Sequence, residues 1–544
     1  MSLDTVRADS TRWPAWGLSS ATVRGSLFGL FLLALVATAW VHDDAFISFR
    51  TVDNFVAGRG LTWNDGERVQ VFTHPLWFFL HAGLYVLVHE IYITTLSLCL
   101  LCSVLTVYFL AFRLSACARD GALVIAALLL SQGFLDYSTS GLETPLSHLL
   151  IVFIGWRAWP RRAAHLSGLA LLTALAGLNR LDLLPLLLPI LVLAGRRAGR
   201  NQRLQALAVF GLPLLLWEAF SLIYFGFLVP NTAPAKLATG ISGLGKLTQG
   251  LSFLGSSLVH DGFTVLLGAW LLSVAWRRSS EGRAVAIGVG LYLAYLVAIG
   301  GGYMSGRLLT APYLLLIVSL IRDPSPARPI PRPAPWIAIA VVTLLVRSFA
   351  TLAGQPVDPV GIGNERRVWH PFTGLVYFLS ESSWPEAGWR LVPGEHCDAQ
   401  VCILSRDTVG LIGYYSGPEV YILDANALAD PFRARLPGIR RGDFNLPGRM
   451  AWRPGHVRRP RPAGFVDSLK SGDNRIEDPG LARFYDATRL VTRGPLWSQA
   501  RWREIWRLNT GAYDEAIRAW AERNPSLFQP RDLRREIARW NRRE

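Results

Sequence analysis

The sequence predicts a polytopic α-helical membrane protein that carries a soluble α/β domain after its last span. Of the 544 residues, 51% are hydrophobic and only 17% are charged, and the mean hydropathy is +0.29. That composition is too apolar for an ordinary soluble protein. Apolar runs recur over the first 354 residues, whereas the last 190 or so are rich in Pro, Gly, Trp and Arg. We therefore expect a membrane domain followed by a soluble one.

The apolar runs predict about eleven transmembrane helices. A helix needs about 20 residues to cross a bilayer, so the shorter runs must include flanking polar residues. The second run is long enough for more than one crossing, and residues 75–90 are the candidate for an interfacial or re-entrant helix. The runs cover 25–41, 75–112, 121–137, 145–159, 166–178, 183–195, 204–229, 262–276, 284–304, 308–321 and 336–353.

The loops between these runs alternate between two kinds. One kind is arginine-rich: "WRAWPRRAAH", "GRRAGRNQR", "WRRSSEGR" and "RDPSPARPIPRP". Positive loops stay on the cytoplasmic side, so the other loops should face outward. This predicts a cytoplasmic segment 1–24 that leads into a retained first span, a membrane domain 25–354 with a catalytic outer loop 42–74, and an outer soluble domain 355–544.

The remaining bulk features are less specific. A net charge of +16 would suit nucleic acid, but no reading helix or stacking platform is visible, and membrane orientation explains the arginines. Cys397 and Cys402 could close a small disulfide loop outside the cell, and their spacing does not indicate zinc. In the soluble part, "AQVCILS", "TVGLIGYYSG" and "EVYILDANALADP" predict strand, helix and strand. The tail predicts two amphipathic basic helices broken at Pro530.

Paired carboxylates follow the first span directly. Asp43 and Asp44 open the stretch "DDAFISFR", and carboxylates at a span end are often functional, since they are costly to bury. A helix cap or a solvated helix end is the alternative. A carboxylate can accept the proton of a nucleophile, and Arg50 could pair with an aspartate or hold a phosphate. The same loop also carries His74 among its polar groups.

The other outer loops add carboxylates, cations and flexible backbone. Glu143 in "SGLETPL" lies before a helix, where a capping box with Ser140 is the alternative. For Arg180 and Asp182 in "LNRLD", the alternative to a binding role is a structural ion pair. Two further loops, "FLVPNTAPAKL" and "GGGYMSGRLL", supply Asn231, Lys236 and Arg307.

Cations beside carboxylates at a membrane edge suit a lipid-linked phosphosugar. Cations bind the phosphate, and a carboxylate activates the acceptor hydroxyl or stabilises an oxocarbenium-like centre. The chain has no Walker, G-x-S-x-G, H-E-x-x-H or dinucleotide-binding motif, which disfavours ATPases, serine hydrolases and zincins. A transporter is an alternative, although the ionisable groups gather at one face and no repeat is visible. A non-catalytic scaffold is another.

Five segments resemble the GT-C membrane glycosyltransferases, in particular the terminal β-(1→2)-arabinofuranosyltransferase family of mycobacteria. They are "DDAFISFRTVDNFVAGRGLTWNDGERV", "TSGLETPL", "YFGFLVPNTAPAK", "GGYMSGRLLTAP" and "GIGNERR". The resemblance implies a GT-C-like fold and a catalytic site lined by Asp43 and Asp44. The sequence departs from the family pattern at Tyr303, where an acidic residue is usual, and at "NRLD", where Asp182 is the nearest acidic equivalent.

The resemblance implies transfer of D-arabinofuranose from a polyprenyl-phosphate donor to a glycan or surface protein, on the outer face of a bacterial inner membrane. We expect Asp43 and Asp44 to be catalytic. A GT-C enzyme that transfers a mannose-like sugar is the alternative. No resident cofactor or metal site is predicted, and a divalent cation that bridges an aspartate and the donor phosphate stays open. The expected substrate-binding residues are Arg50, His74, Glu143, Arg180, Asp182, Asn231, Lys236 and Arg307.

Overall fold

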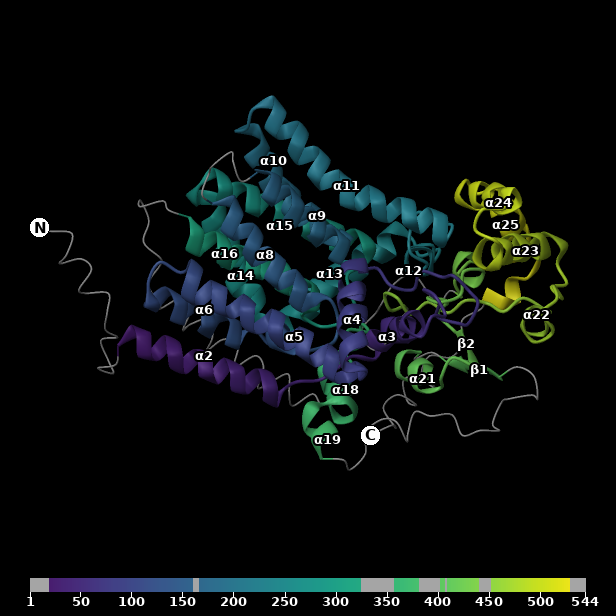
Figure 1. The fold of residues 1–544 in the computed structure, drawn as a ribbon, viewed down its shortest axis with the longest axis horizontal. Helices are drawn as coiled ribbons and strands as arrows, with labels where there is room; N and C mark the ends of the chain where they lie inside the picture. Colours follow the sequence, from purple (N-terminus) through teal and green to yellow (C-terminus); the bar gives the residue numbers. More distant parts are fainter. Residues whose placement is uncertain are drawn as a thin grey trace, which may run out of the picture.

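The computed structural model describes residues 19–159, 166–323, 357–380, 402–406, 409–439 and 452–528. A bundle of long helices makes up one part of the molecule (Figure 1). The described residues from 357 onward form a smaller part, named the outer part for its place beyond one end of the bundle. The predicted run 336–353, the tail beyond Pro530 and the proposed disulfide partner Cys397 lie outside the described residues. The chain is helix-rich with few strands, as a helical membrane protein requires.

Four helices of the described residues are long and apolar enough to cross a membrane by length and composition: α2 (Ser20–Ala37), α5 (Ile91–Tyr108) with its π-helical continuation η1 (Phe109–Leu114), α11 (Arg200–Tyr224) and α15 (Ser280–Ile299). Counting the bent pair α13–α14 as one span makes five. The count of eleven spans stays a prediction. The bundle also contains α6 (Ala118–Leu130), α7 (Gln132–Asp136), α8 (Thr144–Ala158), α9 (Leu166–Asn179), α10 (Leu184–Arg196) and α16 (Thr310–Arg322).

Two features of the membrane part refine the sequence prediction. The run 75–112 is broken at His89, whose left-handed φ of 56° ends the short helix α4 (Pro75–Val88) before α5 begins. The predicted runs also miss α13 (Gly243–His260), because its Gly, Ser and Thr residues hide its apolar character. It meets α14 (Gly262–Arg278) at a bend of 110°.

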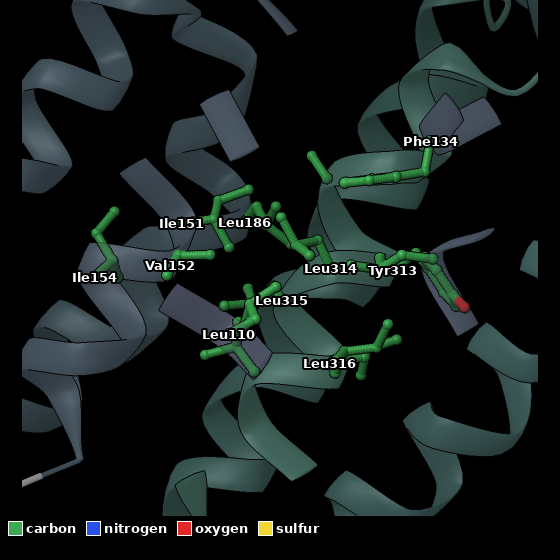
Figure 2. Close-up of a cluster of buried hydrophobic side chains, with 14 of the residues drawn as sticks. Leu110, Phe134, Ile151, Val152, Ile154, Leu186, Tyr313, Leu314, Leu315 and Leu316 are labelled. Carbon is green, nitrogen blue, oxygen red and sulfur yellow. The ribbon is translucent and has the colours of Figure 1, made fainter. Parts of the chain in front are cut away.

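The core of the bundle lies around α16, whose residues are nearly all buried. Side chains of α8 and α10 pack against it, and Figure 2 shows Ile151, Leu186 and Leu314 meeting there. The helices approach closely because Gly155 faces Val318, and a Cβ at Gly155 would lie 2.0 Å from Val318 Cγ1. This packing fixes the helix ends, on which the polar loops are carried.

The outer part has a small α/β unit and a helical cluster. Strands β1 (Cys402–Arg406) and β2 (Val420–Asp424) pair in parallel around α21 (Gly410–Tyr415), which confirms the predicted strand, helix and strand. Helices α18 (Glu365–Thr373) and α19 (Leu375–Leu379) precede this unit. The cluster α22 (Phe465–Ser471), α23 (Pro479–Arg493), α24 (Gln499–Asn509) and α25 (Asp514–Arg523) follows it. The short helices α3 (Asp43–Val56) and α12 (Thr232–Leu237) lie between the two parts (Figure 1).

Candidate active site

The loops that carry the sequence motifs converge at one end of the helical bundle. Glu143 directly precedes α8, Arg180 directly follows α9, and Arg307 lies just before α16. Their charged groups meet, since Glu143 lies within 3.6 Å of Arg180 and 2.7 Å of Arg307. The alternation of loops therefore brings the predicted polar groups together in space.

The arginine-rich loops meet at the opposite end of the bundle. Arg197, after α10, lies 2.6 Å from Glu281 at the start of α15. Arg278, at the end of α14, donates a hydrogen bond of 3.4 Å to the carbonyl of Asp323 after α16. The described residues of the two kinds of loop thus lie at two ends of the bundle, and their assignment to the two sides of a membrane stays a prediction.

Helix α3 places the two adjacent aspartates in its first turn. His42 is the N-cap, and its Nδ1 accepts a hydrogen bond of 2.8 Å from the backbone N–H of Asp44. Carboxylates in the first turn are stabilised by the unpaired N–H groups and the helix dipole. Successive residues of a helix point about 100° apart, so Asp43 and Asp44 must face different surroundings.

Asp43 faces the outer part and is buried. Its Oδ1 accepts a hydrogen bond of 2.8 Å from the N–H of Leu411, and its Oδ2 accepts one of 3.3 Å from Gly410. A Cβ at Gly410 would lie 1.8 Å from the carbonyl oxygen of Asp43, so only glycine allows this approach. Burial raises the pKa of Asp43 to about 7, although the bond from Leu411 opposes the shift. This carboxyl fastens α21 onto α3.

Asp44 faces the loops and remains partly exposed. Its Oδ2 accepts a hydrogen bond from the hydroxyl of Tyr303. Burial alone would raise the pKa of Asp44, but the charges of His42 and Lys236 and the Tyr303 bond outweigh it, and the pKa lies below its ordinary value. Asp44 is therefore a carboxylate at neutral pH.

Glu143 holds a cluster of cations beside this carboxylate. It is the N-cap of α8 but makes no side-chain cap hydrogen bond, so the capping box is not formed. Its carboxylate instead contacts Arg307, Arg180 and His74, the last at 3.6 Å. Burial would raise the pKa of Glu143, but the Arg307 charge leads the groups that lower it to about 2. The result is a permanently ionised cluster that orients Arg307.

Arg180 is held from a second side. Its Nε donates a hydrogen bond of 2.9 Å to Oδ1 of Asp182, and its Nη2 contacts Oδ2 of the same carboxylate. The ion pair weighed as the alternative for "LNRLD" is thus present. His74 links the cluster to α3, because its Nε2 lies 3.0 Å from Oγ of Ser48.

Lys236 is the exposed cation of the site. It lies near the end of α12, and in the described part of the chain it makes no hydrogen bond or ion pair. Burial of its surroundings lowers the pKa of Lys236, while the neighbouring charge of Asp44 opposes the shift. A Cβ built at Gly455 would lie 3.5 Å from its Cε, so the loop 453–459 borders it. An ammonium group placed here is available to an anionic ligand.

Buried charged side chains behind Tyr303 hold its ring in place. Arg453 lies over its ring at 4.5 Å, and Arg453 Nη2 donates a hydrogen bond of 2.5 Å to Glu365. The other oxygen of Glu365 lies 3.3 Å from Nε2 of His42, the residue that caps α3. This chain of contacts connects the backbone of Asp44 to the residue that bonds its side chain.

His456 packs edge-on against the same tyrosine, with ring centroids 4.6 Å apart. Burial lowers the pKa of His456 to about 4, and the Arg453 charge adds to the shift. Its Nδ1 lies 3.2 Å from the carbonyl of Pro454, which favours the tautomer with the proton on Nδ1. His456 is then neutral, with a lone pair on Nε2.

Exposure separates the residues that a ligand can reach from those that support them. Lys236 is exposed, and Asp44, Tyr303, Arg307 and His456 are partly exposed. The supporting groups are buried: His42, Asp43, Glu143, Arg180, Glu365 and Arg453. The reachable set comprises one carboxylate, two cations, one phenol and one imidazole.

Two of the predicted residues lie elsewhere. Arg50 donates hydrogen bonds to the backbone carbonyls of Trp63 at 2.6 Å, Val420 at 2.8 Å and Gly413. Asn231 donates from its amide to the carbonyls of Ala427 and Leu428. Both side chains tie the outer part to the bundle. Their predicted contacts with substrate stay predictions.

Comparisons with known proteins point to one family. No protein-family model matches the chain. A terminal β-(1→2)-arabinofuranosyltransferase of Mycobacterium tuberculosis is 30% identical over 331 residues, which is 51% of this chain and 51% of the relative. The protein of the same name from Corynebacterium glutamicum is 28% identical over 344 residues, 52% of this chain and 48% of the relative.

The chain is similar to terminal β-(1→2)-arabinofuranosyltransferases. It spans about half the length of the curated relatives it matches. The resemblance inferred from the motifs "DDAFISFR" and "FLVPNTAPAK" is therefore confirmed over about half of the chain.

Sequence reasoning missed four contributors to this site. Glu365 lies in "GIGNERR", a segment that carries the family resemblance but received no predicted role, and Arg453 and His456 lie in "RPGHVRR". His42 directly precedes the aspartate pair and received no predicted role. The only available signal was the occurrence of charged residues in these short motifs. In the described residues, no three His, Cys, Asp or Glu side chains gather as a metal site.

Proposed function

We propose that this chain is a membrane glycosyltransferase that moves D-arabinofuranose from a polyprenyl-phosphate donor to a cell-surface glycan or glycoconjugate. The observation that carries the proposal is the ionised carboxylate of Asp44 placed beside Lys236 and Arg307 at the end of a bundle of apolar helices. The similarity to arabinofuranosyltransferases over half of the chain supports the choice of sugar.

The reachable groups match the charges of such a reaction. The bond between the anomeric carbon and the phosphate oxygen breaks, and the phosphate leaves with an added negative charge. Lys236 and Arg307 are placed to stabilise that charge. The acceptor hydroxyl forms the new bond to the anomeric carbon, and its proton passes to a base. Asp44 is the base or the anion that faces the positive charge of the sugar.

The surrounding residues would set the reactivity of Asp44. Tyr303 orients its carboxylate, and His42 caps the helix that carries it. Asp43 acts as a positioning residue, because both of its oxygens are taken up by the backbone of α21. This assigns different roles to the two aspartates that the sequence treats as a pair.

The site would lie on the outer face of a bacterial plasma membrane. The arginine-rich loops at the opposite end of the bundle support that orientation, since such loops remain in the cytoplasm. The isoprenoid tail of the donor would lie in the bilayer among the apolar helices. The glycan acceptor would approach from outside, beside the outer part.

Purified protein in detergent tests this proposal. Short-chain polyprenyl-phospho-arabinofuranose and polyprenyl-phospho-mannose are supplied separately with a panel of glycan acceptors, with and without a chelator. Transfer of arabinose alone supports the proposal. Transfer of mannose alone would contradict arabinofuranose as the donor sugar and make the chain a mannosyltransferase. Binding of neither donor contradicts a polyprenyl-phosphosugar site. Loss of activity with the chelator would add a divalent cation to the site.

A further inference from the structure

Two sets of apolar side chains on the outer part are exposed. On the helical cluster, Trp497 and Trp506 are 73% and 72% exposed. On α19, Val376 and Leu379 are 57% and 70% exposed. Exposed groups of this size on a soluble surface indicate a binding partner.

The first set is attached to the outer end of a span. Arg501 of α24 donates hydrogen bonds of 2.8 and 3.0 Å to the carbonyls of Ile223 and Tyr224, the last residues of α11. Asn509, at the other end of α24, donates one of 2.9 Å to the carbonyl of Gly226. Helix α24 therefore lies beside the end of α11 (Figure 1).

The chain that leaves α11 extends this surface. Leu228 and Val229 follow the span and are 52% and 51% exposed. Trp506 lies on the same helix as Asn509, whose side-chain oxygen accepts a hydrogen bond of 3.4 Å from the N–H of Leu228. Arg503 is exposed one turn before Trp506 on α24. The surface thus combines tryptophan, aliphatic side chains and an exposed cation.

The second set is attached to the outer end of another span. The N–H of Leu375 in α19 donates a hydrogen bond of 3.0 Å to the carbonyl of Ala39, two residues after α2 ends. Gly374 forms a β-bridge with Trp40. In Figure 1, α19 and α24 lie on opposite sides of the bundle.

The two spans concerned are the least buried of the four long apolar helices. Only 17% of the apolar window of α2 and 11% of that of α11 is buried in the protein, against 44% and 50% for the others. Their remaining surface must face lipid, and their outer ends mark the membrane surface. Tryptophan and arginine are the residues that settle in the headgroup layer.

We propose that α19 and α24 rest in the headgroup layer of the outer leaflet and seat the outer part on the bilayer at two opposite sides. The tryptophans and aliphatic side chains enter the boundary between headgroups and acyl chains, and Arg503 meets lipid phosphates. This seating rests on surface and span geometry alone. It holds whichever reaction the site catalyses.

Spin labels at single positions test this seating. Trp506→Cys and Leu379→Cys are labelled in proteoliposomes of phosphatidylethanolamine and phosphatidylglycerol, and Asp473→Cys, 74% exposed after α22, is the control. The unsubstituted protein, labelled in parallel, gives the background from native cysteines. Each variant is first checked for unchanged size and melting temperature, which such exposed positions permit.

We expect collisions with oxygen, relative to those with a water-soluble nickel chelate, to be several-fold more frequent at 506 and 379 than at 473. In detergent-free amphipol, which provides no bilayer, the collision ratios at the three positions should become similar. Equal ratios at 506 and 473 in liposomes would overturn the seating and leave a protein partner or a second copy to cover the tryptophans. Enhanced ratios at 379 alone would overturn it for α24.

Discussion

The hydroxyl of Tyr303 bonds the carboxylate of Asp44 across 259 residues of sequence. Asp44 lies in the first turn of α3, after the first span, and Tyr303 lies in the glycine-rich loop between α15 and α16. The bond lowers the pKa of Asp44 together with the nearby charges of His42 and Lys236. It is the contact on which the reactivity of this carboxylate most directly depends.

Replacing Tyr303 with Phe removes only this bond. A hydrogen bond to a charged group contributes about 1.5–3 kcal/mol, so we expect transfer to fall about tenfold or more. Because the bond favours the ionised form, its loss raises the pKa of Asp44. The acidic limb of the pH–rate profile should therefore move to higher pH. Tyr377→Phe, on the surface of α19, is the control, and an unmoved acidic limb would contradict this role.

Lys236 should contribute to donor binding without contributing to stability. Lys236→Ala removes an exposed cation that has no partner among the described residues, so the melting temperature should stay the same. We expect kcat/KM for the lipid-linked donor to fall about 10- to 100-fold, since a phosphate charge loses its counter-ion. Lys246→Ala is the matched control on α13. Donor kinetics equal to those of the control would remove Lys236 from the site.

Glu365 should act through Tyr303. It accepts a hydrogen bond from the buried Arg453, which lies over the Tyr303 ring. Glu365→Gln weakens this support, and we expect lower transfer with donor affinity retained. In a double-mutant cycle with Tyr303→Phe, the two losses should combine to less than their product, because both act on one contact. Fully multiplicative losses would show that Glu365 acts by another route.

Asp43 should affect the pH dependence of stability. Its pKa in the folded protein is about 7, above the ordinary 3.8, so folding keeps the proton on the carboxyl. That contribution is complete below about pH 4 and is lost as the pH rises towards 7. The melting-temperature advantage of the wild type over Asp43→Asn should therefore shrink between pH 4 and 7. Asp473→Asn, at an exposed position, should show no such change, and a constant gap for Asp43→Asn would contradict the assignment.

The sequence predicts the membrane class and the side on which polar loops gather, because apolar length and arginine placement are local properties. It also finds Asp44, Glu143, Lys236 and Arg307 as charges at span ends. It misses α13, whose Gly, Ser and Thr residues reduce its hydropathy. For Arg50, a charge after a span end does not reveal whether the guanidinium bonds a ligand or the backbone carbonyls that it contacts in the structure, and its predicted role in substrate binding stays a prediction.

The supporting residues could not be found in the same way. Glu365 and Arg453 reach the site from segments more than 300 residues beyond Asp44. The residues around them in the sequence do not indicate such long-range contacts. The sequence does not distinguish the proposed roles of Asp43 and Asp44 for a similar reason. Those roles depend on which side of α3 receives α21, which only the packed structure determines.

The comparison of Asp44→Asn with Asp43→Asn tests the central claim most directly. Both variants are purified in detergent, checked for donor binding and melting temperature, and assayed for arabinose transfer from the short-chain donor. We predict that Asp44→Asn binds donor, melts like the wild type and loses transfer by about 100-fold or more. Asp43→Asn should melt lower and keep measurable transfer. Full activity in Asp44→Asn, or loss confined to Asp43→Asn, would contradict the account.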